Sequence, residues 1–279
     1  MAHKTLVNGT AYDVKGGKVL VNGTGYDIKN GKTLVNGTGY TVGFSVPINS
    51  LEIGTSVYMN VNGVRTEFLV VNKGIPQSSS LYDSSCDGVW LLMKDCYTTM
   101  KYQTSGSSSN YKTSAINSYL STTFLGFLDS GMQTTIKEVK VSYLDTSTYD
   151  SEHSATLRTG SDGMSAKVFI LSAREVGSGD KTYGYTATSK NIMEDGATLD
   201  YFSDLGSGNP TTKRVAYLNG EPIEWHTRTA MAPSSPFVVI CVDSTGAISL
   251  NYGSGIYGVR PAMIVPFDVK VDSSMNIVV

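Results

Sequence analysis

The order of apolar and polar positions divides the chain into a repeated segment and a longer segment without repeats. In residues 1–44 a 14-residue pattern occurs three times, starting at Lys4, Lys18 and Lys32. In each copy an apolar pair runs into Asn-Gly, the dipeptide that most readily adopts a type I′ turn, and alternating Thr and Tyr positions follow. The period therefore predicts three short β-hairpins, and a hairpin of this size buries too little apolar surface to be stable alone.

The period ends in a polar stretch that contains Pro47, so we place a linker at residues 45–50. A head domain at residues 51–267 and a C-terminal β tail at residues 268–279 then follow. Short apolar runs separated by turn residues predict the strands of the head and tail. These strands are expected at residues 57–61, 64–71, 90–93, 139–143, 167–171, 213–217, 223–229, 237–242, 247–250, 257–265, 269–271 and 276–279.

Residues after Thr113, a suitable N-cap, have the spacing of an amphipathic helix. The apolar stripe of this helix consists of Ile116, Tyr119, Leu120, Phe124, Phe127 and Leu128. A shorter helix is expected at residues 132–139 and a helical turn at residues 195–202. These patterns together predict an α+β head with mostly antiparallel strands and one or two helices, preceded by an all-β repeat stem.

The composition narrows the classes of partner. Charged residues make up 16% of the chain, the net charge is −2 and the pI is about 5.9, so there is no basic stripe to bind nucleic acid. The first residues lack the apolar core of a secretory signal, and no apolar run is long enough to span a bilayer. We expect a protein that is made in the cytoplasm, has no signal peptide and does not insert into a membrane.

The cysteines, Cys86, Cys96 and Cys241, are odd in number and lack the CxxC spacing of a zinc or redox site. They are interpreted as buried free thiols, with a bridge between Cys86 and Cys96 as the alternative.

Candidate catalytic and metal-binding groups are few. The histidines are His3, near the start, His153, in a polar loop, and His226, which follows Trp225 in a strand and is expected to be packed and hydrogen-bonded. No Gly-x-Ser-x-Gly elbow is present. We therefore expect no catalytic residue and no cofactor.

The polar stretch at residues 144–165 contains Asp150, Glu152, His153 and Asp162, and a metal-binding loop is one interpretation of it. The spacing does not match a set of metal ligands, so a solvated loop without a metal is favoured.

Several ordered motifs of the head resemble one family. The motifs lie at residues 67–71, 81–92, 115–124, 225–230 and 257–264. The last two are similar to the Trp-x-Leu-Arg-Ser and Gly-Ile-Arg-Pro-Ala endings of a family of phage and Firmicutes proteins. The resemblance implies a C-type-lectin-like fold for the head. Thr227 and Thr229 stand where that family prefers Leu and Ser, which leaves the preference for sugar or peptide open.

The repeat resembles short Lys-Thr-Leu-Val-Asn-Gly-Thr repeats found ahead of such domains in predicted tail proteins of phages. That resemblance implies a place on a virion, where the repeat would contact other virion proteins. We also expect the repeats to associate with copies of themselves, with a homotrimer favoured, through ladders of Leu and Tyr side chains. The residues expected in these ladders are Leu6, Tyr12, Leu20, Tyr26, Leu34 and Tyr40.

A binding surface is expected towards the end of the head. Arg228 and Arg260 are candidates for ligand contact, but each can instead pair with an acid such as Glu224 or Asp268, or with carbonyls at a strand end. The segment 230–256, with the tyrosine that follows it, mixes aromatic rings and small polar groups, although Phe237 and Val239 are expected in the core. The candidate ligand residues are Arg228, Met231, Ser234, Ser235, Asn251, Tyr252, Ser254 and Tyr257.

These observations favour a phage virion protein of the tail-fibre or baseplate type, an adhesin whose head binds a host-surface glycan or protein. Two alternatives remain open. One is a capsid or neck decoration or joining protein without catalytic activity, and the other is a hydrolase of surface polysaccharide.

Overall fold

The computed structural model describes residues 45–77, 79–104, 109–147, 156–179, 195–205, 211–230 and 237–279, and the backbone of six strands in the repeat. Each repeat contributes one antiparallel pair of strands, so the pairing follows the 14-residue period. The pairs are β1 (Lys4–Val7) with β2 (Thr10–Asp13), β3 (Lys18–Val21) with β4 (Thr24–Asp27), and β5 (Asn30–Val35) with β6 (Thr38–Gly43).

Two five-stranded sheets form the centre of the head. The first sheet has the order β16 (Val168–Phe169), β23 (Ala262–Val265), β10 (Val89–Met93), β9 (Val64–Lys73), β8 (Ser56–Val61). The second sheet has the order β11 (Thr98–Lys101), β22 (Ile256–Val259), β19 (Trp225–Ala230), β20 (Val238–Val242), β21 (Ile248–Tyr252). Neighbouring strands are antiparallel except β19 and β22, which pair in parallel.

One two-stranded ribbon belongs to both sheets. β10 pairs with β23 in the first sheet, and their chain continuations β11 and β22 pair in the second. The prediction of one strand at residues 257–265 was therefore wrong, because the chain turns from one sheet into the other at Arg260 and Pro261. Arg260 holds this corner: its Nε donates to the carbonyl of Met93 at 2.9 Å and its Nη2 to that of Lys94 at 2.7 Å.

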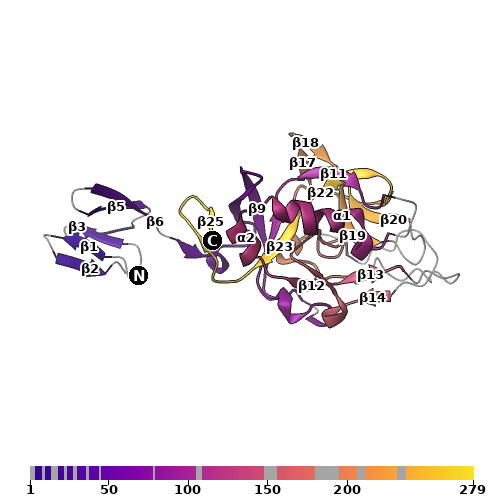
Figure 1. Ribbon diagram of the computed structural model, residues 1–279, viewed down its shortest axis with the longest axis horizontal. Helices are drawn as coiled ribbons and strands as arrows, with labels where there is room; N and C mark the ends of the chain where they lie inside the picture. The colour runs from indigo at the N-terminus through magenta and orange to yellow at the C-terminus, as the bar shows by residue number, and fades with distance from the viewer. Residues whose placement is uncertain are drawn as a thin grey trace.

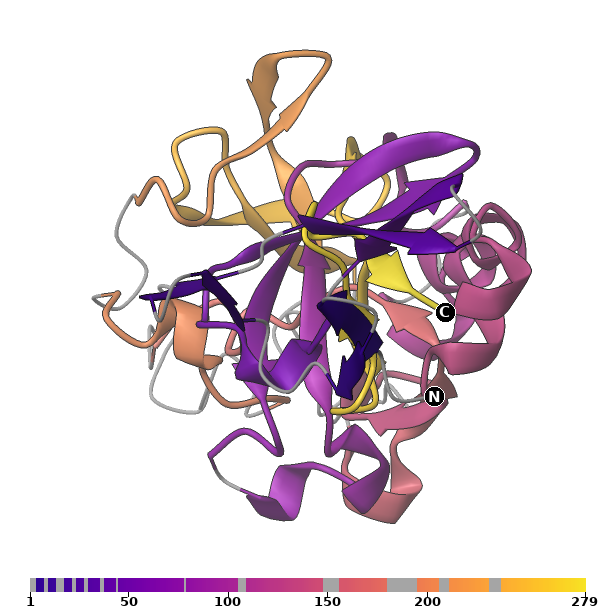
Figure 2. The same ribbon diagram turned by 90° about the vertical axis from the view of Figure 1, so that its left-hand side faces the viewer.

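Short elements surround the sheets (Figure 1). The smaller sheets are β12 (Val139–Val141) with β15 (Met164–Ala166), β13 (Tyr143–Asp145) with β14 (Thr156–Arg158), and β17 (Ala216–Leu218) with β18 (Glu221–Ile223). The 3-10 turns are η1 (Ile48–Ser50), η2 (Ser79–Leu81), η3 (Ser84–Cys86), η4 (Tyr111–Thr113), η6 (Gly160–Asp162) and η7 (Asp200–Phe202). The β17–β18 hairpin, orange, projects from the body of the head (Figure 2).

The predicted amphipathic helix is divided into two parts. It starts as α1 (Ala115–Tyr119) and continues as a π-helical turn, η5 (Leu120–Phe124), with Ile116, Leu120 and Phe124 buried. The N-cap is Ser114 rather than Thr113, since the Ser114 hydroxyl accepts a bond from the backbone N–H of Asn117. The second helix is α2 (Ser130–Thr135).

The predicted α+β class was wrong. Strands account for 39% of the residues and helices for 18%, so the fold is mostly β-sheet. The prediction gave too much weight to the apolar stripe after residue 113. This stripe forms only a short α-helix and a π-helical turn, which pack beside the sheets rather than forming a layer of their own.

The first and last residues of the head are packed together. β7 (Val46–Pro47) and β25 (Ile277–Val278) flank β24 (Lys270–Val271) in a three-stranded sheet. Ile48 is fully buried, and its backbone N–H donates to the carbonyl of Val269. The linker and tail segments of the sequence are thus parts of the packed head, on the side where the repeats lie in Figure 1.

The core runs through both sheets. Its largest apolar side chains include Trp90 and Trp225, which are fully buried. The three cysteines are buried free thiols, as predicted. The strand predicted at residues 213–217 starts only at Ala216, because Arg214 holds a turn there: its side chain is fully buried and donates to the carbonyls of Val176, Gly177 and Gly246.

Candidate functional site

Arg228, a predicted ligand residue, lies in the interior. It is fully buried, and its guanidinium forms a two-pronged pair with the buried Glu175, with both N–O distances 2.6 Å. Its three remaining bonds go to the carbonyls of Ser142, Ile170 and Asp195. All five N–H donors of the guanidinium are therefore occupied, and no donor is left for a ligand.

The carboxylate of Glu175 also accepts several hydrogen bonds. Besides the two bonds from Arg228, its carboxylate accepts from the backbone N–H of Ser172 at 2.9 Å and from the hydroxyl of Tyr82 at 3.2 Å. Burial lowers the pKa of Arg228, but the attraction of Glu175 outweighs this and holds the pKa above its ordinary value. This buried ion pair links β19 to the segment that follows β16.

A second carboxyl group, Asp195, lies beside this pair. It is fully buried and accepts a bond from the hydroxyl of Thr229 at 2.9 Å. Burial raises the pKa of Asp195 to about 7, although Arg228 and Thr229 act in the opposite direction. The acids proposed from the sequence as arginine partners, Glu224 and Asp268, are not the partners of Arg228.

Three surface side chains of the second sheet form a polar cluster with a tyrosine beside it. Glu224 precedes β19, and its Oε1 accepts bonds from the hydroxyl of Ser249, at 2.6 Å, and from the side-chain amide of Asn251. Residues 249 and 251 share a face of β21 because side chains alternate along a strand. The charge of Glu224 also acts on Tyr257, whose pKa is raised, first by burial and then by this carboxylate. We call Glu224, Ser249, Asn251 and Tyr257 the sheet-face cluster.

The ring of Tyr257 is held in place by its neighbours. It stands edge-on to the ring of His226, with centroids 5.2 Å apart. It also lies so close to Gly255 that a β-carbon at that position would collide with it. An aromatic ring, an amide, a hydroxyl and a carboxylate are thus fixed together, a combination that suits a ligand with both apolar and hydroxyl groups.

The structure separates the other predicted ligand residues from this cluster. Tyr252 follows Asn251 and lies on the opposite face of β21, where it is 67% exposed. Ser254 lies in the exposed turn after β21. Met231, Ser234 and Ser235 lie outside the described residues, as do the side chains of the ladder residues predicted in the repeat.

Tyr252 belongs to an exposed apolar group at the end of the head. Phe237, expected in the core, is 49% exposed and Ile256 is 62% exposed. The backbone N–H of Gly253 donates to the carbonyl of Phe237, which brings the start of β20 beside the turn after β21. β20 lies at the opposite end of the head from the repeats (Figure 1). We call Phe237, Tyr252 and Ile256 the apolar tip.

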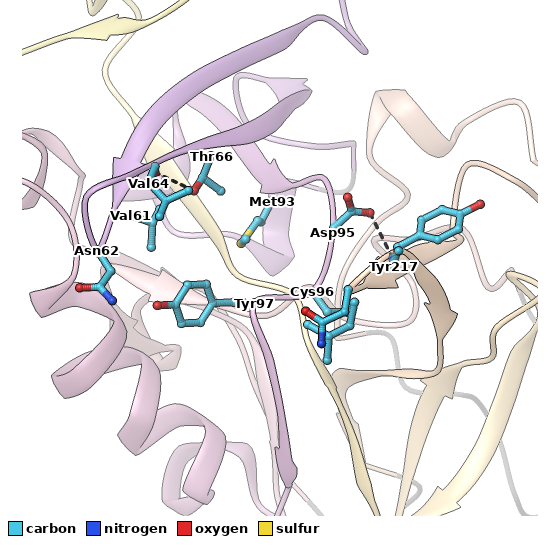
Figure 3. Close-up of a pocket in the computed structure, with 12 residues that line it drawn as sticks. Val61, Asn62, Val64, Thr66, Met93, Asp95, Cys96, Tyr97 and Tyr217 are labelled. Atoms are coloured by element: carbon cyan, nitrogen blue, oxygen red, sulfur yellow. Dashed lines mark hydrogen bonds between the residues drawn. The ribbon is translucent and has the colours of Figure 1, made fainter.

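A pocket of about 450 Å³ lies between two hairpin tips and the corner of the shared ribbon (Figure 3). The tips are Asn62-Gly63, between β8 and β9, and Asn219-Gly220, between β17 and β18. Neither tip was considered as a binding element from the sequence, and the Asn-Gly dipeptide at residue 219 was overlooked as a turn signal.

One cysteine–histidine pair occurs in the described chain, and its environment is unsuited to nucleophilic catalysis. The Sγ of Cys241 is 3.7 Å from Nδ1 of His226, and Nε2 of His226 donates to the carbonyl of Met100. Burial raises the pKa of Cys241 and lowers that of His226 to about 4. At pH 7 both groups are neutral, whereas a nucleophilic cysteine acts as the thiolate.

Metal-ligating side chains are dispersed in the described parts of the head. No three of its His, Cys, Asp and Glu side chains come close enough together to hold a metal ion. Asp150, Glu152 and His153, which suggested a metal loop, lie outside the described residues. None of the helices in the described segments is long and apolar enough to cross a membrane.

Comparison with known proteins gives one match. A family model described as a domain of unknown function (DUF6273) matches residues 87–267, well over half of the chain. No curated protein and no solved structure matches. The matched region includes the Arg228–Glu175 pair and the sheet-face cluster, while the repeats and the β8–β9 hairpin precede it.

Proposed function

Because the chain belongs to the family described as a domain of unknown function (DUF6273), its activity has to be inferred from its own surface, and we propose that it is a phage virion adhesin. The head binds a glycan or a protein on the host surface. The repeats connect the head to other virion proteins and associate into a homo-oligomer. The proposal combines the resemblance of the repeats to those of phage tail proteins with the chemistry of the exposed end of the head.

The observation that carries the proposal is the apolar tip. Tyr252, Ile256 and Phe237 are each about half exposed or more, at the end of the head away from the repeats. Large apolar side chains that stay exposed are costly in water, and three of them at one end of the head indicate a binding surface. The sheet-face cluster, which shares strands β21 and β22 with the apolar tip, adds fixed hydrogen-bonding groups on the face of β21 opposite Tyr252.

Association of the repeats would strengthen weak binding by the head. A head with a single small contact surface binds weakly, whereas several linked heads on one particle engage a cell together. The repeats suit such a role because three isolated hairpins have little core of their own and gain stability by packing against copies.

The test is binding of labelled full-length chain to a panel of intact Firmicutes cells. We expect the double variant Tyr252→Ala, Ile256→Ala to bind at least tenfold more weakly than the unchanged chain, with the same melting temperature, because both side chains are mostly exposed. Val278→Ala is the control, because Val278 is 51% exposed but belongs to β25, which lies on the side of the head that faces the repeats (Figure 1). If the double variant bound cells as well as the unchanged chain, the adhesin proposal would be contradicted. If particles that lack the chain then failed to assemble, a joining protein would be favoured.

A second measurement addresses the oligomer. Sedimentation of the full-length chain should give a trimer, and the variant with Tyr12, Tyr26 and Tyr40 all changed to Ala should give a monomer. A monomer in the unchanged chain at high concentration would contradict the role of the repeats.

A further inference from the structure

We propose that the pocket in Figure 3 is a subsite for one neutral sugar unit. This inference rests on the proposed function, since it names a class of surface ligand for the adhesin. It concerns a place on the head that is separate from both the apolar tip and the sheet-face cluster.

The walls of the pocket are rigid. Asn62 and Gly63 have φ angles of 51° and 75°, and Asn219 and Gly220 have φ angles of 54° and 86°. Two successive residues with positive φ define a type I′ turn, the tightest connection between antiparallel strands. Both turns therefore fix the backbone from which Asn62 and Asn219 project, and they place two exposed amide groups at the pocket.

The floor joins these two walls. The backbone N–H of Cys96 donates to the carbonyl of Tyr217, and the backbone N–H of Tyr217 donates to Oδ1 of Asp95 at 3.1 Å. These bonds tie the β17–β18 hairpin to the corner of the ribbon. The carboxylate of Asp95 is thereby anchored at the pocket.

The charge of the residues that line the pocket determines whether a charged or a neutral ligand fits. Asp95 is the charged side chain among the residues that line the pocket, and no Lys, Arg or His lines it in the described chain. The nearby Lys94 is directed to Glu67, with an N–O distance of 3.0 Å. The lining offers no cation to pair with a phosphate or carboxylate, and the charge of Asp95 repels such groups, so the pocket favours a neutral ligand.

The remaining lining supplies an apolar wall. Tyr97 extends across the pocket toward Asn62, and Met93 lies between the two walls (Figure 3). The ring of Tyr97 is fixed by edge-on packing against Phe124 at 5.0 Å and by contact with Phe127. A pyranose ring has an apolar face and a rim of hydroxyls, and it matches an ordered aromatic wall with amide and carboxylate groups around it.

The test uses the full-length chain and saturation-transfer NMR with methyl glycosides of glucose, galactose, rhamnose and N-acetylglucosamine. We expect at least one glycoside to bind at millimolar concentration. The double variant Asn62→Gly, Asn219→Gly should weaken that binding at least tenfold. Glycine adopts positive φ without strain, so both hairpin tips are kept while both amides are removed.

The control is Asn60→Ala, which removes an exposed amide of β8 that bonds to Asp129 and does not line the pocket, so it should leave glycoside binding unchanged. Absence of binding by all four glycosides, binding that persists in the double glycine variant, or loss of binding in the control would each overturn the inference. Cell binding without glycoside binding overturns the pocket alone, whereas glycoside binding without cell binding overturns the adhesin proposal alone.

Discussion

β10 and β19 occupy the same position in their sheets but have opposite chemistry. Both lie inside a five-stranded sheet, and every residue of each is buried. β10 reads Val-Trp-Leu-Leu-Met, whereas β19 reads Trp-His-Thr-Arg-Thr-Ala. Burial of the first strand follows from its apolar side chains, while burial of the second requires a partner for each polar group.

The difference lies in how specific the surroundings must be. The side chains of β10 need neighbours of suitable shape, such as Phe169 and Tyr82 around Trp90, and their one polar group, the Trp90 indole N–H, donates to nearby backbone carbonyls. The polar groups of β19 need partners of matching charge at bonding distance, and these come from distant segments, namely Glu175 and Asp195. A polar buried strand therefore depends on its loops, and four predictions test this dependence.

The largest expected effect is at the ion pair. Glu175→Ala leaves the Arg228 guanidinium buried without its counter-charge, which should lower the free energy of unfolding by about 3–5 kcal/mol in urea denaturation. The double variant Arg228→Met, Glu175→Leu removes both charges and should recover most of this loss. A loss below about 1 kcal/mol for Glu175→Ala would show that β19 does not depend on the pair.

Next in size is the removal of one hydroxyl. The Thr229 hydroxyl accepts a bond from the backbone N–H of Ala173 and donates to Asp195. Thr229→Val conserves volume but leaves these groups unpaired, so it should cost about 1–3 kcal/mol. The matched change in β10, Leu91→Met, should cost less than about 1.5 kcal/mol. Equal costs in urea denaturation would remove the distinction between the strands.

The pH dependence of stability separates two buried groups. The folded pKa of Asp195, about 7, is above its unfolded value, so folded protein binds more protons and stability falls as pH rises from about 4 to 7. The folded pKa of His226, about 4, is below its unfolded value, so stability rises between pH 4 and about 6.5. The two effects oppose each other in the unchanged chain.

Single variants should reveal each slope. With Asp195→Asn, the free energy of unfolding in urea should increase from pH 4.5 to 6.5, and with His226→Gln it should decrease. Each slope should be at most ~1.4 kcal/mol per pH unit. Identical pH profiles for the two variants would contradict the assignment of these pKa shifts to Asp195 and His226.

The smallest effect is expected for an ion pair at the surface. Lys94 and Glu67 are 3.0 Å apart, but their side chains are 50% and 26% exposed. Lys94→Ala should change the free energy of unfolding by about 1 kcal/mol or less, because water screens the pair. If Lys94→Ala lowered the free energy of unfolding as much as Glu175→Ala, the strength of an ion pair would not depend on its burial.

The sequence predicted the apolar elements better than the polar ones. The β8–β9 hairpin, β10 and the buried cysteines were confirmed, because apolar runs and Asn-Gly turns act locally. The fold class was wrong because an apolar stripe does not show how far a helix extends before it meets the sheets. The position of Phe237 was wrong because an aromatic residue at a strand end suits either the core or the surface.

The candidate site was predicted only in part. Asn251 and Tyr257 were chosen for their residue types, and the structure brings both near Glu224, which the sequence suggested only as one possible partner of an arginine. The pairing of Arg228 with Glu175 could not be read from the sequence, because the two residues are brought together by tertiary packing. The pocket was missed for the same reason, since its walls come from two hairpins far apart in the chain.

The three-stranded sheet where the head begins has a mechanical consequence. Tension applied through the repeats enters the head at β7, which is held by β24 and, through Ile48, by the backbone of Val269. The chain before β24 leads directly to β23, next to β10 in the centre of the first sheet. A pull is therefore carried straight into the core, and the head should stay folded under load until this short strand pair shears.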